Sequence, residues 1–199
     1  MSRLTAANSN ETGLPVTIYS DVICPWCYVG KRRFETALEA PGMPTLLAIS
    51  WRPFELNPEM PEGGMERHAY RLQKFGPEKA RHLDIQMAET GREAGIAFAF
   101  DKMKRTPNTR LAHRLIWEAE RQGGQPLQNA LVDRLFQGYF EEGANIGTAD
   151  TLLSFAKEAG FDEKGAKTAL HGEESLAAVL DLEDAGLSMG IQGVPFFIL

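Results

Sequence analysis

Apolar residues follow two different patterns along this chain of 199 residues. Short β-branched and apolar runs, typical of buried strands, occur at 14–23, at 46–51 and at 196–199. Elsewhere, apolar residues recur at the three- and four-residue spacing of amphipathic helices. This spacing predicts helices at 26–39, 77–94, from 106–109 to the glycines at 123–124, and at 126–141, 149–159, 162–171 and 173–189.

The order of these elements indicates the fold class. The strand at 14–23, the helix at 26–39 and the strand at 46–51 have the lengths of a βαβ unit, which favours parallel pairing. Residues 58–65 are rich in proline, glycine, glutamate and methionine, as in a linker or an exposed loop. No further strand is predicted before 196–199. We therefore expect an α/β protein in which a long helical segment separates the second strand from the last.

Composition and charge exclude several classes of partner. The apolar fraction of 43% and the charged fraction of 24% are ordinary for a soluble globular protein. A net charge of −6 argues against nucleic-acid or anionic-membrane binding. No apolar run approaches the roughly 18 residues of a membrane span. Residues 1–13 are polar and lack the apolar segment of a secretory signal, so we expect a cytoplasmic protein with a disordered N-terminal leader.

The chemistry is expected where the first strand meets the first helix. The two cysteines of the chain, Cys24 and Cys27, stand there in a Cys-Pro-Trp-Cys motif. Two intervening residues in a first helical turn bring both sulfurs to one side, and a helix N-terminus stabilises an anion by about 0.3–2 kcal/mol. Pro25 suits that turn, because its fixed φ is helical. The motif predicts a redox dithiol with Cys24 as nucleophile and Cys27 as the resolving thiol.

Less specific interpretations of the same residues remain open. A zinc site needs four ligands, and the four histidines are scattered without ligand-like spacing, so no metal is expected. A structural disulfide across so short a loop would stabilise little, while two inert buried thiols are a further alternative. His113 lies beside an apolar stripe and is typical of a core or interface histidine. The basic residues at 31–33 indicate a solvated helix face, or a source of positive potential near Cys24.

The last ten residues predict a tight loop that enters a strand. Gly190 and Gly193 precede Val194-Pro195, and an aromatic, β-branched run follows. A proline is tolerated at the first position of a strand, because its missing N–H need not enter the ladder. Tight turns are also where cis X-Pro bonds are usually found. We therefore expect Val194-Pro195 to be cis.

Together these motifs resemble a known family, the DsbA-like oxidoreductases. The likeness is to their cytoplasmic branch, which is grouped with frenolicin-biosynthesis-type proteins and 2-hydroxychromene-2-carboxylate isomerases. It extends from residue 15 to the end of the chain. The segments that carry it are Ser20–Glu35 around the cysteines, Arg52–Pro58, Thr106–Thr109, Ala112–Leu115, Gly138–Phe140 and Gly193–Phe197.

The resemblance implies a thioredoxin-like fold interrupted by an all-helical insertion domain. The thioredoxin-like part would comprise 14–57 and 189–199, and the insertion 58–188. The resemblance also implies that the Val194-Pro195 loop faces the dithiol and offers its backbone to an extended substrate segment. The residues expected to bind substrate are Pro25, Trp26, Val194, Pro195, Asn108 and His113.

Two positions depart from relatives of this branch. The glutathione-dependent isomerases typically have a serine at the nucleophile position, where this chain has Cys24. Periplasmic members have a histidine directly before the second cysteine, where this chain has Trp26. Because an indole cannot act as a cation, we expect a less acidic Cys24 and a less strongly oxidising pair.

The expected function is that of a thiol–disulfide oxidoreductase, or isomerase, acting on disulfides of proteins or small molecules. It would need no bound cofactor, and glutathione is a candidate co-substrate. One alternative is a glutathione-dependent isomerase or transferase that acts on an aromatic small molecule. Another is a non-catalytic module that binds peptides with its helical insert. The sequence leaves open the substrate, the direction of electron flow and the partner that recycles the pair.

The apolar strand at 196–199 carries one further expectation. Nothing after Leu199 would pair with it or cover it, and an exposed apolar edge invites association. We therefore expect the natural protein to continue with a further strand and a helix, as the family resemblance also implies. The alternative is a homodimer in which a second copy covers this edge.

Overall fold

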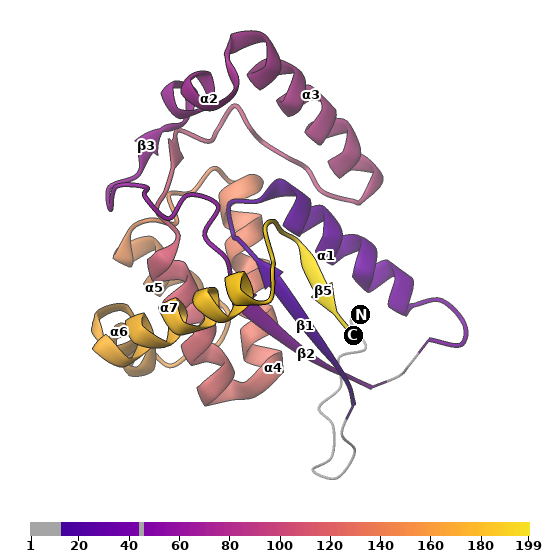
Figure 1. Ribbon diagram of the computed structural model, residues 1–199, viewed down its shortest axis with the longest axis vertical. Helices are drawn as coiled ribbons and strands as arrows, with labels where there is room; N and C mark the ends of the chain where they lie inside the picture. Colours follow the sequence, from indigo (N-terminus) through magenta and orange to yellow (C-terminus); the bar gives the residue numbers. More distant parts are fainter. Residues whose placement is uncertain (1–12, 44–45) are drawn as a thin grey trace.

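A computed structural model describes residues 13–43 and 46–199 (Figure 1). Residues 1–12 of the leader predicted for 1–13, and the residues at 44–45, lie outside the described residues. In the part that is described, no helix combines the length and the apolar character needed to cross a membrane.

A three-stranded sheet forms the centre of the fold, in the order β2–β1–β5. Strands β1 (Leu14–Ser20) and β2 (Leu47–Pro53) are parallel along their whole length and are joined by helix α1 (Pro25–Leu38). The predicted βαβ unit is therefore confirmed. Strand β1 ends three residues before the predicted end at Ile23, because the carbonyl of Asp21 accepts a hydrogen bond from the Cys24 N–H at 2.9 Å and turns the chain into α1.

Strand β5 (Phe196–Ile198) runs antiparallel to β1 and shows how the sheet is covered. Ile18 lies opposite Phe197, and Tyr19 lies opposite Phe196, so the two pairs occupy opposite faces. Helix α1 covers the first face, where the rings of Phe34 and Phe197 are 5.5 Å apart. Helix α7 (Glu173–Ser188) lies on the second face, where a Cβ at its Gly186 would meet the Tyr19 ring at 2.7 Å.

A long, mainly helical segment separates β2 from β5, as predicted (Figure 1). One prediction for this segment is wrong. The short antiparallel strands β3 and β4 pair within it, although no strand was expected before the last residues. The elements before α7 are β3 (Met65–Glu66), α2 (Arg67–Phe75), α3 (Pro77–Glu93), β4 (Arg105–Thr106), α4 (Arg110–Phe140), α5 (Ala149–Glu158) and α6 (Glu163–His171).

Helix α4 is the central element of this segment. The two helices predicted here follow each other directly in α4, and the helical backbone is interrupted only at Gly124, where φ is 62°. The second half supplies the outer edge of β2 with side-chain partners: Gln125 accepts a hydrogen bond from the Ile49 N–H at 3.0 Å. Gln128 accepts from the Trp51 N–H at 2.9 Å and donates to the Trp51 carbonyl at 3.1 Å. The edge of the sheet is thus occupied by α4.

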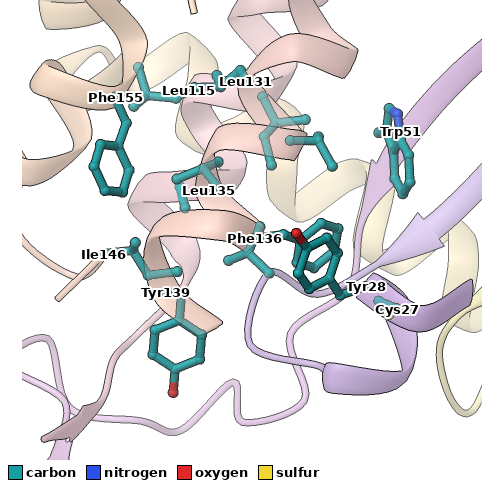
Figure 2. Close-up of a cluster of buried hydrophobic side chains, with 14 of the residues drawn as sticks. Cys27, Tyr28, Trp51, Leu115, Leu131, Leu135, Phe136, Tyr139, Ile146 and Phe155 are labelled. Atoms are coloured by element: carbon teal, nitrogen blue, oxygen red, sulfur yellow. The ribbon is translucent and has the colours of Figure 1, made fainter. Parts of the chain in front are cut away.

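One hydrophobic core joins the sheet to the helical segment (Figure 2). Tyr28 of α1 stacks on Phe136 of α4, with ring centroids 5.1 Å apart, and Trp51 of β2 meets the same ring at 6.5 Å. Cys27, one residue before Tyr28, belongs to this core and is 1% exposed. The dithiol is therefore anchored where the two parts of the chain meet.

The basic segment of α1 is not uniformly solvated. Lys31 is 1% exposed, and its Nζ lies 2.8 Å from Asp133 of α4 and also pairs with Glu35. The prediction of a solvated face is wrong for this residue, since carboxylates on two helices compensate the buried charge.

Candidate active site

Cys24 is the N-terminal cap of α1, and Pro25 is the first helical residue. The carbonyl of Cys24 accepts hydrogen bonds from the N–H groups of Cys27, at 3.0 Å, and Tyr28, at 3.4 Å. Among the described residues, no side chain caps this helix end by a hydrogen bond. The sulfur of Cys24 thus lies at the helix N-terminus, the position that the motif predicts, where backbone N–H groups favour a negative charge.

The environments of the two thiols differ. Both cysteines are free thiols in this structure, and both are buried. Burial raises the pKa of Cys27 well above its ordinary value, and the neighbouring Cys24 raises it further. The hydroxyl of Ser20 and the N–H of Asp21 act in the opposite direction without outweighing burial. Cys27 is therefore a protonated thiol at neutral pH and cannot attack until it loses that proton.

The loop before β5 lies directly against the dithiol. The peptide bond between Val194 and Pro195 is cis. The Sγ of Cys24 donates a hydrogen bond to the Val194 carbonyl at 3.6 Å. The Pro195 ring packs on α1 at Gly30, where an added Cβ would lie 3.0 Å from the proline Cγ. The first two turns of α1 and this loop therefore form one contact surface around Cys24.

Four of the six residues expected to bind substrate lie around this contact. Pro25, Val194 and Pro195 are half-buried, and Trp26, beside Cys24 in the motif, is 45% exposed. Phe196, which follows the loop, is 43% exposed. The surroundings of the nucleophile therefore offer the partly exposed Trp26 ring and the Val194 backbone carbonyl.

The other two expected residues hold the scaffold. The side-chain amide of Asn108 donates to the Met60 carbonyl at 2.7 Å and accepts from the Arg110 N–H at 3.0 Å. His113, in the first turn of α4, is 3% exposed. Neither presents a free polar group to solvent, so the structure does not bring them to the accessible rim of the site.

A buried charged cluster behind the dithiol went unnoticed in the sequence. Asp21 is fully buried and accepts hydrogen bonds from the N–H groups of Leu56, at 2.8 Å, and Ile23, at 3.3 Å. The Nε2 of His113 lies 3.6 Å from its carboxylate, too far for a hydrogen bond of normal geometry. Asp21 thereby ties the loop that carries Cys24 to the loop that follows β2.

Two further acids complete this cluster. Glu55 accepts two hydrogen bonds from Arg110, at 2.8 and 2.9 Å. Burial raises the pKa of Glu183, on α7, to about 7, with His113 and Arg110 opposing the shift. Burial alone would lower the pKa of His113, but the carboxylates around it, Asp21 first, raise it. These residues come from separate segments, so no local motif could have revealed the cluster.

Within 13–43 and 46–199, no group of three or more histidine, cysteine, aspartate or glutamate side chains is arranged to hold a metal ion. The arrangement of the two cysteines suits thiol chemistry, with the Cys24 sulfur at a helix N-terminus and Cys27 buried one helical turn further on.

The sequence was compared with known proteins. It matches the family of DSBA-like thioredoxin domains over residues 15–199. The protein YwbO of Bacillus subtilis (strain 168) is 30% identical over 155 residues, which are 78% of this chain and 70% of that protein.

Solved structures of similar shape were also found. A probable DsbA oxidoreductase, SCO1869, from Streptomyces coelicolor superposes with a TM-score of 0.81 at 29% identity, covering 93% of this chain and 80% of that one. The cytosolic disulfide reductase DsbM from Pseudomonas aeruginosa, solved with GSH, superposes with a TM-score of 0.64 at 24% identity, covering 94% of this chain and 86% of that one.

Proposed function

Because this chain belongs to the family of DSBA-like thioredoxin domains, a family of oxidoreductases and isomerases, we propose that it exchanges thiols and disulfides through Cys24 and Cys27. The observation that carries the proposal is the pairing of the two sulfurs. Cys24 caps α1 against the Val194 carbonyl, and Cys27 lies buried behind it as a protonated thiol. The fold, a thioredoxin fold with a helical insertion, is that of the family.

The proposed reaction has two steps. The Cys24 thiolate attacks one sulfur of the substrate disulfide, and the other sulfur leaves as a thiolate, so that a mixed disulfide forms. Cys27 then loses its proton and attacks the Cys24 sulfur, and the second substrate sulfur leaves. The dithiol becomes a Cys24–Cys27 disulfide, and the substrate gains two electrons.

The surface around Cys24 supports substrates with an apolar character. Trp26, two residues after Cys24 in the motif, is 45% exposed. We propose that an extended segment bearing the disulfide lies along the Val194-Pro195 loop, with the Trp26 ring beside it. Disulfides of proteins and of small molecules both fit this description.

Glutathione is the proposed co-substrate and the cytoplasm the proposed compartment. Support comes from the similarity to DsbM, which is described as cytosolic and was solved with GSH. Glutathione would return the oxidised pair to the dithiol by the same two steps in reverse. In a reducing compartment, two cysteines are more often catalytic than structural.

Single-cysteine variants test the division of labour. With oxidised glutathione as the disulfide, Cys24→Ser should lose all turnover, whereas Cys27→Ser should accumulate glutathione on Cys24, measured by intact mass. Alkylation at neutral pH should label Cys24 faster than Cys27, because the pKa of Cys27 is raised. Faster labelling of Cys27 would show that the roles are reversed. Full turnover by Cys27→Ser would instead show that Cys24 exchanges thiols and disulfides without Cys27.

A further inference from the structure

The resolving step poses a problem that the cysteines alone do not solve. Cys27 is 1% exposed, so its proton cannot pass directly to bulk water. The Ser20 hydroxyl, at the end of β1, lowers the pKa of Cys27, and a hydroxyl can both accept and donate a proton. Its Oγ is buried and makes no hydrogen bond of normal geometry with any described residue.

A small cavity adjoins Ser20. Its volume is about 10 Å³, close to the least that holds one water molecule. His113 forms another part of its wall, and His113 Nε2 is also buried without a hydrogen-bond partner among the described residues. A buried water normally satisfies such polar atoms, provided that it has at least two partners. The remaining apolar walls are Val22, Trp51, Ile116 and Val132.

The charged groups around the cavity favour a proton on the imidazole. From the loop after β1, the Asp21 carboxylate lies 3.6 Å from His113 Nε2. Glu183 of α7 and Glu55 also face His113 and raise its pKa, although Arg110 of α4 pairs with Glu55.

One cation adjoins the cavity itself. Arg52 of β2 belongs to the wall of the cavity. Its guanidinium Nη1 lies 2.5 Å from Oε2 of Glu120, which compensates its charge. Among the described groups that shift the pKa of Cys27 most, Cys24 is the titratable one. The imidazole is thus the group around this cavity that can accept a proton and keep it beside a carboxylate.

We propose that one water molecule in this cavity joins Ser20 to His113, and that this relay removes the proton of Cys27 as Cys27 attacks the mixed disulfide. The inference rests on the two-step reaction proposed above. The Cys27 proton passes to the Ser20 oxygen, the Ser20 proton to the water, and a water proton to Nε2 of neutral His113. The Cys27–Cys24 bond forms, the bond from Cys24 to the substrate sulfur breaks, and that sulfur leaves as a thiolate. Ser20 and His113 touch no substrate atom, so their role is to position and move the proton.

The test separates the two steps, with oxidised glutathione as the disulfide. Reactions stopped by acid at short times are analysed by intact mass, which distinguishes glutathione on Cys24 from the internal disulfide. In Ser20→Ala and His113→Gln, glutathione should reach Cys24 at the wild-type rate, and its release should be about 10²-fold slower at pH 7. In the wild type, release should accelerate as pH rises through the pKa of His113, which the Asp21 carboxylate raises above its ordinary value. His113→Gln should lose that inflection.

Ser20→Ala is the decisive variant, because it removes a hydroxyl that makes no hydrogen bond of normal geometry with the described residues, so the variant should fold normally. Ser175→Ala is the matched control: its hydroxyl is also buried, but donates to the Ala169 carbonyl at 2.6 Å, on another part of the molecule. Release at the wild-type rate and with the wild-type pH profile in both Ser20→Ala and His113→Gln would overturn the relay. Absence of glutathione on Cys24 even in Cys27→Ser would overturn the two-step reaction itself, and the relay with it.

Discussion

A single glycine determines how closely the cis-proline loop approaches the dithiol helix. Gly30 faces the Pro195 ring, and the Phe197 ring lies beyond it. An alanine Cβ would stand 3.0 Å from Pro195 Cγ, closer than ordinary van der Waals contact, and 3.6 Å from Pro195 Cβ, an ordinary contact. Because the Val194 carbonyl that contacts Cys24 precedes this proline, any shift of the ring also moves the surface on which the substrate is proposed to lie.

Gly30→Ala should therefore impair activity more than stability. Overpacking costs about 1–3 kcal/mol, but alanine is better than glycine inside a helix by about 0.5–1 kcal/mol, so the two effects partly cancel. Displacement of the loop should lower kcat/KM for disulfide reduction about tenfold. Gly63→Ala, where a Cβ would meet nothing within 4 Å, is the control. Wild-type kcat/KM in Gly30→Ala would show that the contact is unimportant.

Glu183 makes stability depend on pH. Its pKa is raised from 4.5 to about 7 in the folded protein, so the folded state keeps a proton that the unfolded state releases. The stabilisation that the protonated Glu183 contributes is fully present below about pH 4.5, and it declines as pH rises to about 7. The raised pKa of His113 acts in the same direction, because its stabilising charge is lost as pH rises.

The variant Glu183→Gln should flatten this decline. At pH 8 it should be more stable than the wild type by about 1–3 kcal/mol, and at pH 4 the two should be similar. Urea unfolding at a series of pH values measures both slopes. Asp184→Asn changes an exposed carboxylate on the same helix and should leave the slope unchanged. A slope in Glu183→Gln equal to that of the wild type would contradict the assignment.

At the scale of elements, β2 is an edge strand whose free backbone is satisfied by another element. Gln128 of α4 is completely buried and bonds both the N–H and the carbonyl of Trp51. Gln128→Leu would leave both groups buried without partners, so it should cost about 2–4 kcal/mol in urea unfolding. Gln137→Leu alters an exposed glutamine on the same helix and should cost far less. Equal losses in the two variants would mean that water replaces the amide.

Some of the helices and strands could be predicted from the sequence, and others could not. Periodic apolar spacing indicated β1, β2 and the helices with buried faces, because burial imposes that spacing. Helix α2 was missed because it is only nine residues long and mostly polar, and none of its residues is buried. Strands β3 and β4 have two residues each, too few for any alternation.

In the site, too, residues within one motif could be predicted from the sequence, whereas contacts between distant segments could not. The positions of Cys24 and Cys27 follow from the spacing of one motif, and the position of Pro195 was implied by family resemblance. The burial of Lys31 depends on Asp133, about one hundred residues away in the chain. The cluster around Asp21 likewise exists only once four segments meet, so no sequence pattern could indicate it.

At the scale of the whole molecule, the helical segment is part of the core rather than an appendage. Phe136 of α4 contacts Tyr28 of the dithiol helix and Trp51 of the sheet, and it is completely buried. Burial of these rings removes apolar surface of both parts from water at once. Neither part can therefore lose its packing without exposing the other, and we expect them to unfold together.

Phe136→Ala should reveal this coupling. It should lower the unfolding free energy by about 3–5 kcal/mol, because it leaves a cavity at the junction of the two parts. Far-UV circular dichroism reports mainly the helical segment, whereas tryptophan fluorescence includes Trp51 of the sheet. Both signals should shift to lower urea together and remain coincident. Phe75→Ala in α2, a partly exposed ring away from this junction, should cost less. Separation of the two curves would contradict this coupling, because helical structure would then persist after the surroundings of Trp51 in the sheet had unfolded.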